Sequence, residues 1–204
     1  MISAIVLAAG LSTRMKGEPK ALLRIDERDT FVTRIIRTFN EAGVGDVVVV
    51  VGHEGPRVAA VVRQSDLSVR TVVNPAYAAG QFSSILAGLD AVEGPDLDAV
   101  LLALVDAPLF SASTVQALVH RFEETHAPVV RAVRGDEHGH PVLIARSLLE
   151  AIRGSDPGQG AKPVVRGHAT PEGDVPVDDR GAFIDIDTPD DYAKLLDASG
   201  RIAV

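Results

Sequence analysis

The residues best suited to chemistry lie in the first twenty positions. A short apolar run, residues 2–7, leads into Ala8-Ala9-Gly10, and the basic residues Arg14 and Lys20 follow. Small residues let backbone N–H groups approach a ligand closely, and the two cations add positive charge beside those donors. The spacing favours a pocket for a polyphosphate, although a tight turn with two solvated charges would use the same residues.

Two common nucleotide-binding fingerprints are absent from this segment. It has neither the three-glycine pattern with a downstream acidic residue nor the Gly-Lys-Ser/Thr of a P-loop. An oxidoreductase that binds a dinucleotide in the Rossmann manner is therefore disfavoured.

Carboxylates follow two further apolar runs. Asp106 comes directly after the run at residues 99–104, where a carboxylate can hold Mg²⁺ against phosphate oxygens or, alternatively, cap a turn. Asp185 and Asp187 alternate in a segment that we expect to be a strand. Side chains at such positions point to opposite faces, so we expect only one of the two to reach a shared ion.

Two more segments carry polar side chains that could bind a ligand. Asn74, Gly80 and Ser84 stand where a strand leads into a helix, and they could contact a base edge or simply form a capped turn. His140, within Gly139-His140-Pro141, is a lone histidine, and such residues are more often structural than catalytic.

The elements that must position these residues alternate between strand and helix. Apolar runs predict strands at 2–7, 47–51, 69–73, 99–104, 128–133, 141–145 and 183–187. Helical spacing predicts helices from 31 to a stop at Gly43, and at 56–62, 81–92, 111–124 (capped by Ser111), 147–152, 160–165 and 190–196. The turn at 135–139 suggests a hairpin. We therefore expect one α/β domain over residues 1–204 with a doubly wound, mostly parallel but mixed sheet, whose ligands bind beyond the carboxyl ends of the strands.

Composition narrows the class of protein. The chain has 204 residues, no cysteine and a net charge of −8. The lack of cysteine excludes disulfides and thiolate zinc sites, and the acidic balance disfavours nucleic acid as a partner. No apolar run approaches the ~20 residues that a membrane span needs. We expect a cytoplasmic protein that binds neither membrane nor nucleic acid.

The first loop resembles a known family. Residues 7–15, followed by Pro19-Lys20-Ala21-Leu22-Leu23, resemble the signature loop of the MobA-like NTP transferase domain family. Within it, Ala8-Ala9-Gly10 is more similar to the molybdenum cofactor cytidylyltransferase branch than to the guanylyltransferase branch. The chain departs from the family at Lys16, which precedes Gly17, and at Gln159 and Lys162, where that branch has an acid and an arginine.

The resemblance implies a role for each motif. It implies a Rossmann-like nucleotidyltransferase fold with Mg²⁺ as cofactor, held by Asp106 and by Asp187, with Asp185 as the alternative second ligand. Arg14, Lys20 and Asp106 would be catalytic. His140 and Lys162 would bind the acceptor. The nucleotide would be bound by Leu7, Ala8, Ala9, Gly10, Arg14, Lys20, Asn74, Gly80 and Ser84.

The implied reaction joins an NMP from an NTP to a phosphorylated acceptor and releases pyrophosphate. The resemblance implies CTP as donor and molybdopterin as acceptor, with a molybdoenzyme or its chaperone as a possible protein partner. A GTP-dependent or sugar-phosphate nucleotidyltransferase stays open, because one fold serves many acceptors. A noncatalytic nucleotide-binding protein that delivers a cofactor is the alternative from another class, and the paired carboxylates weaken it.

Overall fold

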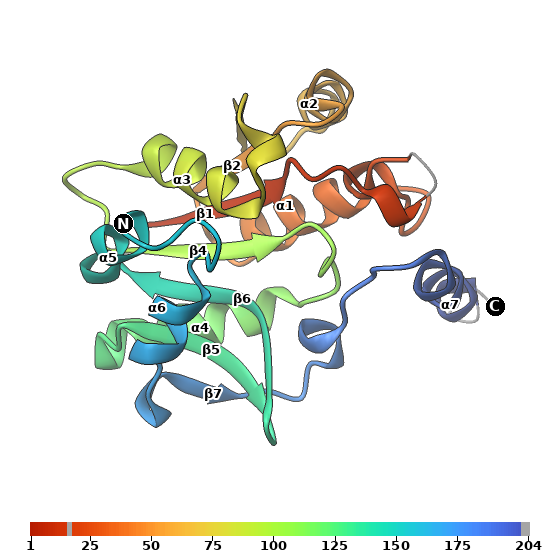
Figure 1. Cartoon of the computed structure of the whole chain (residues 1–204). Coiled ribbons are helices and arrows are strands. Elements are labelled where there is room, and N and C mark those ends of the chain that lie inside the picture. The colour runs from red at the N-terminus through yellow and green to blue at the C-terminus, as the bar shows by residue number, and fades with distance from the viewer. Residues whose placement is uncertain (16–17, 201–204) are drawn as a thin grey trace.

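A mixed sheet forms the centre of the molecule (Figure 1). The computed structural model describes residues 1–15 and 18–200, with side chains to residue 197, so Lys16 and Gly17 lie outside the described residues. Within this part the sheet has seven strands in the order β3-β2-β1-β4-β6-β5-β7. Their bounds are β1 Ile2–Ala8, β2 Asp46–Val51, β3 Arg70–Val73, β4 Ala99–Leu104, β5 Val129–Arg134, β6 Glu137–Ala145 and β7 Asp174–Pro176. Strand β1 pairs in parallel with β2 and β4, whereas β6 is antiparallel to β4 and β5. The predicted mixed α/β fold is confirmed.

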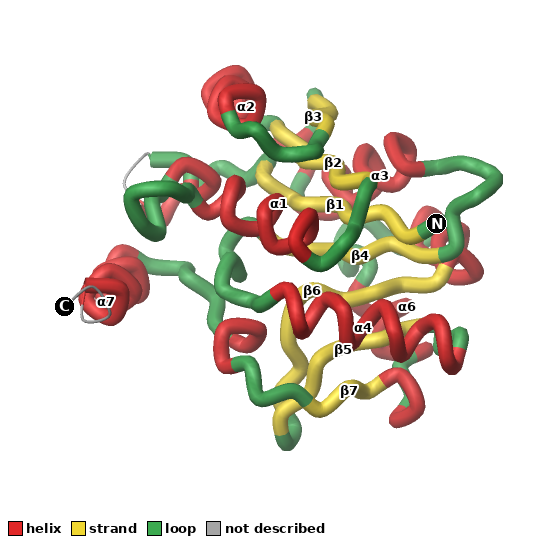
Figure 2. The backbone as a smooth tube through the Cα atoms, turned by 180° about the vertical axis from the view of Figure 1, so that it is seen from behind, coloured by secondary structure: helices red, strands yellow, loops and turns green. Residues whose placement is uncertain are grey.

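Helices cover both faces of the sheet. Helices α1 (Phe31–Glu41), α2 (Gly55–Gln64) and α4 (Ala112–Thr125) pack their apolar residues on one face, which Figure 2 turns toward the viewer. Helices α3 (Gln81–Val92), α5 (Leu149–Arg153) and α6 (Lys162–His168) pack on the other. Strand β2 is therefore buried on both sides, which explains its continuous run of valines.

The seventh helix stands apart from these two layers. Helix α7 (Pro189–Gly200) lies beyond the end of the sheet in both views. Tyr192 of this helix packs edge-on against Phe31, with ring centroids 5.9 Å apart, and both belong to a small apolar cluster with Ile25 and Ile186. This cluster anchors the carboxyl-terminal segment beside the start of α1.

Several predicted boundaries are confirmed by local geometry. Helix α1 is followed by Gly43 in the left-handed region, at φ 89°. Helix α4 begins after Ser111, whose side chain accepts a hydrogen bond from the Thr114 backbone N–H. The predicted hairpin is present, but its strands extend until Arg134 pairs with Glu137, which leaves only Gly135 and Asp136 for the turn.

The predicted last strand at 183–187 is wrong. Phe183 is the last residue of a short 3₁₀ helix at Arg180–Phe183, and residues 184–187 have no strand structure. The last strand is the three-residue β7, which pairs with β5. Ile184 and Ile186 alternate with polar residues as they would in a strand. Ile186 is instead buried in the cluster beneath α7, and its N–H donates to the Asp106 carbonyl oxygen at 2.7 Å. This backbone hydrogen bond ties the segment to the loop that follows β4.

A distant carboxylate completes the start of α4. Asp179 Oδ2 accepts hydrogen bonds from Ser111 N and Ser111 Oγ, both at 2.8 Å, and from Thr114 Oγ1 at 2.6 Å. Burial alone would raise the pKa of Asp179, but the hydrogen bonds from Thr114, Ser111 and Gly181 outweigh it and hold the pKa below its ordinary value. The carboxylate form is therefore favoured in the folded chain.

This arrangement predicts a pH dependence of stability. A native pKa below the unfolded value of about 3.9 stabilises the fold above that pH, and the stabilisation disappears as the pH falls through the native pKa. Asp179→Asn is expected to cost about 2 kcal/mol at pH 7 and to cost progressively less as the pH falls below about 4. Urea unfolding at several pH values measures the cost of the substitution and its change with pH. Asp178→Asn, at an exposed neighbouring position, is the control. A cost that stays constant with pH would contradict the account.

Candidate active site

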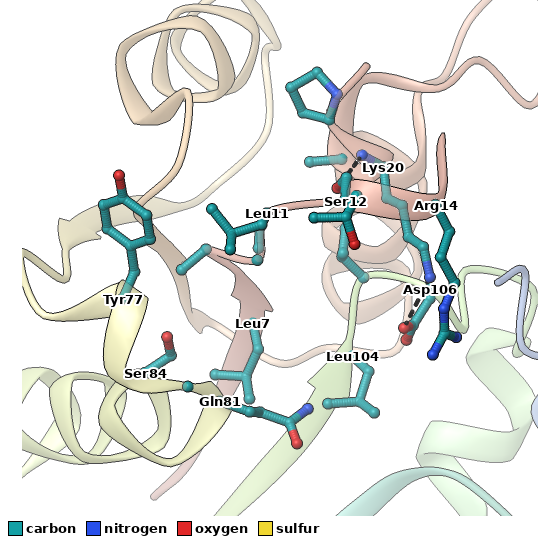
Figure 3. A pocket seen from close by; sticks show the side chains of 18 of the residues that line it. Leu7, Leu11, Ser12, Arg14, Lys20, Tyr77, Gln81, Ser84, Leu104 and Asp106 are labelled. Atoms are coloured by element: carbon teal, nitrogen blue, oxygen red, sulfur yellow. Dashed lines mark hydrogen bonds and ion pairs between the residues drawn. The ribbon is translucent and has the colours of Figure 1, made fainter. Parts of the chain in front are cut away.

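A cavity of about 360 Å³ opens at the carboxyl ends of β1 and β4 (Figure 3). Parallel strands β1 and β4 are neighbours, so the loops that follow them meet at one edge of the sheet. The start of α3 and the segment before α7 complete the wall. The lining residues are Leu7, Ala8, Ala9, Gly10, Leu11, Ser12, Thr13, Arg14, Pro19, Lys20, Ala21, Tyr77, Ala78, Gly80, Gln81, Ser84, Leu104, Val105, Asp106 and Asp187.

Ser12 organises the loop after β1. Its backbone lies in the left-handed region at φ 49°, and its carbonyl oxygen accepts a hydrogen bond from Met15 N at 2.9 Å. Its hydroxyl accepts a second hydrogen bond from Lys20 N, also at 2.9 Å. This link brings the two ends of the loop together and fixes the Lys20 backbone at the cavity.

Gly10 leaves open space on the cavity side of this loop. A Cβ atom built at Gly10 would meet no heavy atom within 4 Å, and the backbone is outside the left-handed region. The fold therefore does not require glycine here. The missing side chain instead keeps room for a ligand beside the backbone.

Gly10→Val is expected to weaken the binding of an NTP by about tenfold or more while leaving the free energy of unfolding within about 0.5 kcal/mol. Calorimetric titration with each of the four NTPs and urea unfolding measure the two quantities. Gly94→Val is the matched control, since a Cβ at Gly94 also meets nothing and Gly94 lies outside the cavity. Unchanged NTP binding in Gly10→Val would show that ligands do not occupy this space.

One end of the cavity is charged. Lys20 Nζ lies 2.6 Å from Asp187 Oδ1 and 3.3 Å from Asp106 Oδ2, so a single ammonium group joins both carboxylates. Arg14 Nη1 lies 3.8 Å from the same Asp187 oxygen, with its side chain mostly exposed. Two cations and two carboxylates thus meet at the place where the sequence predicts polyphosphate and metal binding.

The two carboxylates suit a divalent cation. Asp106 Oδ1 is buried and has no hydrogen-bond partner among the described residues, although a buried carboxylate oxygen ordinarily has one. Oxygen donors of this kind are the ligands that Mg²⁺ prefers, and Mg²⁺ usually takes one or two protein carboxylates with phosphate and water in its other positions. No group of three or more potential metal ligands occurs in the described part of the chain. The site therefore fits an ion that a bound phosphate helps to coordinate.

Backbone hydrogen bonds hold Asp187 beside Asp106. The segment approaches β4 through the bond from Ile186 N to the Asp106 carbonyl oxygen. Beyond it, Asp191 Oδ2 accepts hydrogen bonds from Asp187 N at 3.3 Å and from Thr188 N at 3.0 Å. Asp191 thus caps the first turn of α7, and the two hydrogen bonds fix the direction of the segment at Asp187.

The other end of the cavity is nearly uncharged. Tyr77, Leu11 and the start of α3 form it. Gly80 and Ser84, which the resemblance assigns to nucleotide binding, also line it. A Cβ atom at Gly52 would come within 2.6 Å of Tyr77 Cβ, so glycine at 52 allows Tyr77 to pack against β2. Sequence reasoning missed Tyr77 and Gln81, although both lie inside the Asn74-to-Ser84 segment that it had selected.

Asn74 lies beneath the cavity and does not line it. Its side chain is buried, its Nδ2 donates to Ser83 Oγ at 2.9 Å and to Ser84 Oγ at 3.0 Å, and its Oδ1 accepts from Ala76 N. The residue predicted to contact the base directly therefore supports the loop that carries Tyr77 and Gly80.

His140, Lys162 and Asp185 lie outside the cavity lining. Burial lowers the pKa of His140, against the opposing charges of Asp185 and Asp106, and its Nδ1 is buried without a partner among the described residues. Loss of water around the Asp185 carboxyl group raises the pKa of Asp185, and Asp106 and Asp187 add to this while His140 and Lys20 oppose it. The expected alternation of Asp185 and Asp187 on a strand is absent, but only Asp187 lines the cavity.

Comparison with known proteins gives the same family that the residues of the loop after β1 resemble. The profile of the MobA-like NTP transferase domain matches residues 4–172. The chain belongs to this family. The match spans β1 through the residues just before β7, and so includes both the loop after β1 and Asp106 of the site.

Solved structures share the fold over the whole chain. A nucleotidyl transferase from Methanothermobacter superposes with a TM-score of 0.79 at 25% identity, covering 99% of each chain. Rv0371c from Mycobacterium tuberculosis also gives a TM-score of 0.79 at 25% identity, covering 96% of this chain and 97% of its own. Both solved structures therefore share the fold of this MobA-like domain.

Curated relatives are longer proteins. The bifunctional protein GlmU of Streptomyces griseus is 35% identical over 72% of this chain and 31% of its own length. The bifunctional IPC transferase and DIPP synthase of Rubrobacter xylanophilus is 42% identical over 43% of this chain and 21% of its own length. The chain spans about a fifth to a third of these relatives. Among the described residues, no helix combines the length and apolar character needed to cross a membrane.

Proposed function

We propose that the chain is a nucleotidyltransferase that joins an NMP from an NTP to a phosphorylated acceptor and releases pyrophosphate. The observation behind this proposal is that the two ends of the cavity differ in charge. One end is charged, where Arg14, Lys20, Asp106 and Asp187 meet, and the other end, at Tyr77, is nearly uncharged. An NTP has the same polarity, with a triphosphate at one end and a base at the other. Membership of the MobA-like NTP transferase domain family supports this orientation.

The residues at the charged end would act by positioning and by charge. An acceptor phosphate oxygen attacks the α-phosphorus, and the bond from that phosphorus to the bridging oxygen of pyrophosphate breaks. The nucleophile is already anionic, so no general base is required, and catalysis depends on alignment and on neutralising charge. Arg14 and Lys20 would stabilise the negative charge that develops on the departing pyrophosphate.

Asp106 and Asp187 would hold Mg²⁺, which supplies positive charge against the phosphate oxygens when bound. Asp106 contributes a buried oxygen that has no protein partner among the described residues, and Asp187 lies across the Lys20 ammonium from it. Asp106 follows β4 and Asp187 lies just before α7. Together they would fix the triphosphate relative to the loop after β1.

CTP as donor and molybdopterin as acceptor are the specific form of the proposal. The Ala8-Ala9-Gly10 loop, similar to that of the cytidylyltransferase branch, supports both. The names of the curated relatives, an IPC transferase and GlmU, do not mention molybdenum. A sugar-phosphate acceptor is therefore the alternative within the same reaction class.

Pyrophosphate release from CTP, GTP, UTP and ATP tests the proposal. Each NTP is supplied with Mg²⁺, with and without purified molybdenum cofactor or a panel of sugar phosphates. Turnover that requires CTP and the molybdenum cofactor supports the full proposal, and turnover with a sugar phosphate supports the alternative. Tight nucleotide binding without turnover on any acceptor would instead favour a noncatalytic delivery protein.

A further inference from the structure

The Lys20 ammonium occupies the space between the two carboxylates of the site. Its Nζ is 2.6 Å from Asp187 Oδ1 and 3.3 Å from Asp106 Oδ2. The Lys20 side chain is only 11% exposed, whereas the side chain of Arg14, the other cation, is 71% exposed. Lys20 is therefore engaged with the carboxylates, and Arg14 is open to an incoming phosphate.

A divalent cation cannot share this position with the ammonium group. Mg²⁺ binds carboxylate oxygens at about 2.0–2.1 Å. The Lys20 Nζ contacts an oxygen of each carboxylate, so an ion held by both Asp106 and Asp187 would have to compete with the ammonium group for them. Repulsion between a divalent and a univalent cation at such short range opposes their binding together.

The Lys20 ammonium group can leave the two carboxylates while the backbone of the loop stays in place. The Lys20 backbone is fixed by its bond to Ser12 Oγ and by the 3₁₀ turn at Lys20–Leu22. Only the four-carbon stem must turn to redirect the ammonium group, and Lys20 lines the cavity into which it would turn. A triphosphate in the cavity would offer this group a new set of anionic oxygens.

We propose that Lys20 holds the place of the divalent cation in the nucleotide-free protein, and that an NTP draws the ammonium group away so that the cation binds together with the nucleotide. The proposal rests on the proposed function, which supplies the NTP. Because binding free energies are reciprocally linked, removing the Lys20 charge should tighten cation binding when no nucleotide is present.

Binding of Mn²⁺ alone, measured from the electron paramagnetic resonance signal of the free ion, tests this without any turnover. Lys20→Gln and Lys20→Met are expected to bind Mn²⁺ about tenfold more tightly than the wild-type chain. Lys20→Arg retains the charge and is expected to stay within about threefold of wild type. Arg63→Gln removes a positive charge from an exposed position of α2 outside the cavity and is expected to leave the Mn²⁺ affinity unchanged.

A second substitution locates the effect. Adding Asp187→Asn to Lys20→Gln is expected to abolish the gain in Mn²⁺ affinity, since one of the freed ligands is then lost. Mn²⁺ binding by Lys20→Gln that equals or falls below that of wild type would overturn the proposal. So would an equal gain in Arg63→Gln, which would show a general effect of net charge.

The wild-type chain decides the question if neither neutral variant folds. Its Mn²⁺ affinity is then compared with and without CTP, after the CTP–Mn²⁺ complex has been counted in protein-free samples. Mn²⁺ binding about tenfold tighter with CTP supports the proposal, and equally tight binding overturns it. Failure of the proposed function would be seen separately, as absence of pyrophosphate release, while the nucleotide-free Mn²⁺ results for Lys20 would stand.

Discussion

Asp106→Asn is expected to lower the rate of pyrophosphate release by about a thousandfold or more at saturating NTP. Asparagine has nearly the same shape but lacks the charge, and an NH₂ group that cannot bind a cation replaces one of the two oxygens, so the variant loses half of the paired carboxylate site. The fold should persist, because the backbone bond from Ile186 N to the residue 106 carbonyl does not depend on the side chain. Steady-state kinetics and thermal unfolding measure the two outcomes.

Asp185→Asn is the control for this experiment. Asp185 is a carboxylate two residues from Asp187, but it does not line the cavity. Its substitution is expected to reduce turnover by less than about tenfold. Wild-type activity in Asp106→Asn, or an equal loss in both variants, would contradict the assignment of Asp106 and Asp187 as the metal pair.

Gly181→Ala is expected to lower both stability and activity. A Cβ atom at Gly181 would lie 2.0 Å from the Leu109 carbonyl oxygen and 2.7 Å from the Leu109 carbonyl carbon, so the two backbones must move apart. These backbones belong to the segments that carry Asp187 and Asp106. The expected costs are about 2 kcal/mol in unfolding free energy and, for a displacement near 1 Å, about a hundredfold in turnover.

Gly167→Ala separates this effect from a general response to the loss of a glycine. Gly167 lies in α6, and a Cβ there would meet nothing within 4 Å, so alanine should be neutral or slightly stabilising. Urea unfolding and pyrophosphate release are measured for both variants. If Gly181→Ala were as stable and active as Gly167→Ala, the close approach of the two segments would not position the site.

Much of the fold could be predicted because it follows from local patterns. The valine run of β2 marks a strand buried on both faces, and Ser111 marks the start of α4 with a cap that the structure contains. The same is true of the loop after β1, whose small and basic residues face one cavity. In each case the responsible residues are close together in the sequence.

Distant contacts decide the features that local sequence patterns do not reveal, and the wrong strand at 183–187 is one of them. Residues 183–187 alternate like a strand, yet Ile186 bonds to Asp106 and packs under α7, contacts that no local pattern announces. Asn74 has the polar side chain expected of a base contact, but it hydrogen-bonds to Ser83 and Ser84 and stays buried. The pairing of Lys20 with Asp187, 167 positions away, likewise depends on the folded chain.

Transfer of label from CTP carrying radioactive phosphorus at the α position tests the central claim most directly. The wild-type chain is incubated with the labelled CTP, Mg²⁺ and the molybdenum cofactor or a sugar phosphate, and the products are separated. The account predicts label in the acceptor, one unlabelled pyrophosphate for each transfer, and neither in Asp106→Asn. Label that stays in CTP with every acceptor, despite measurable CTP binding, would contradict it.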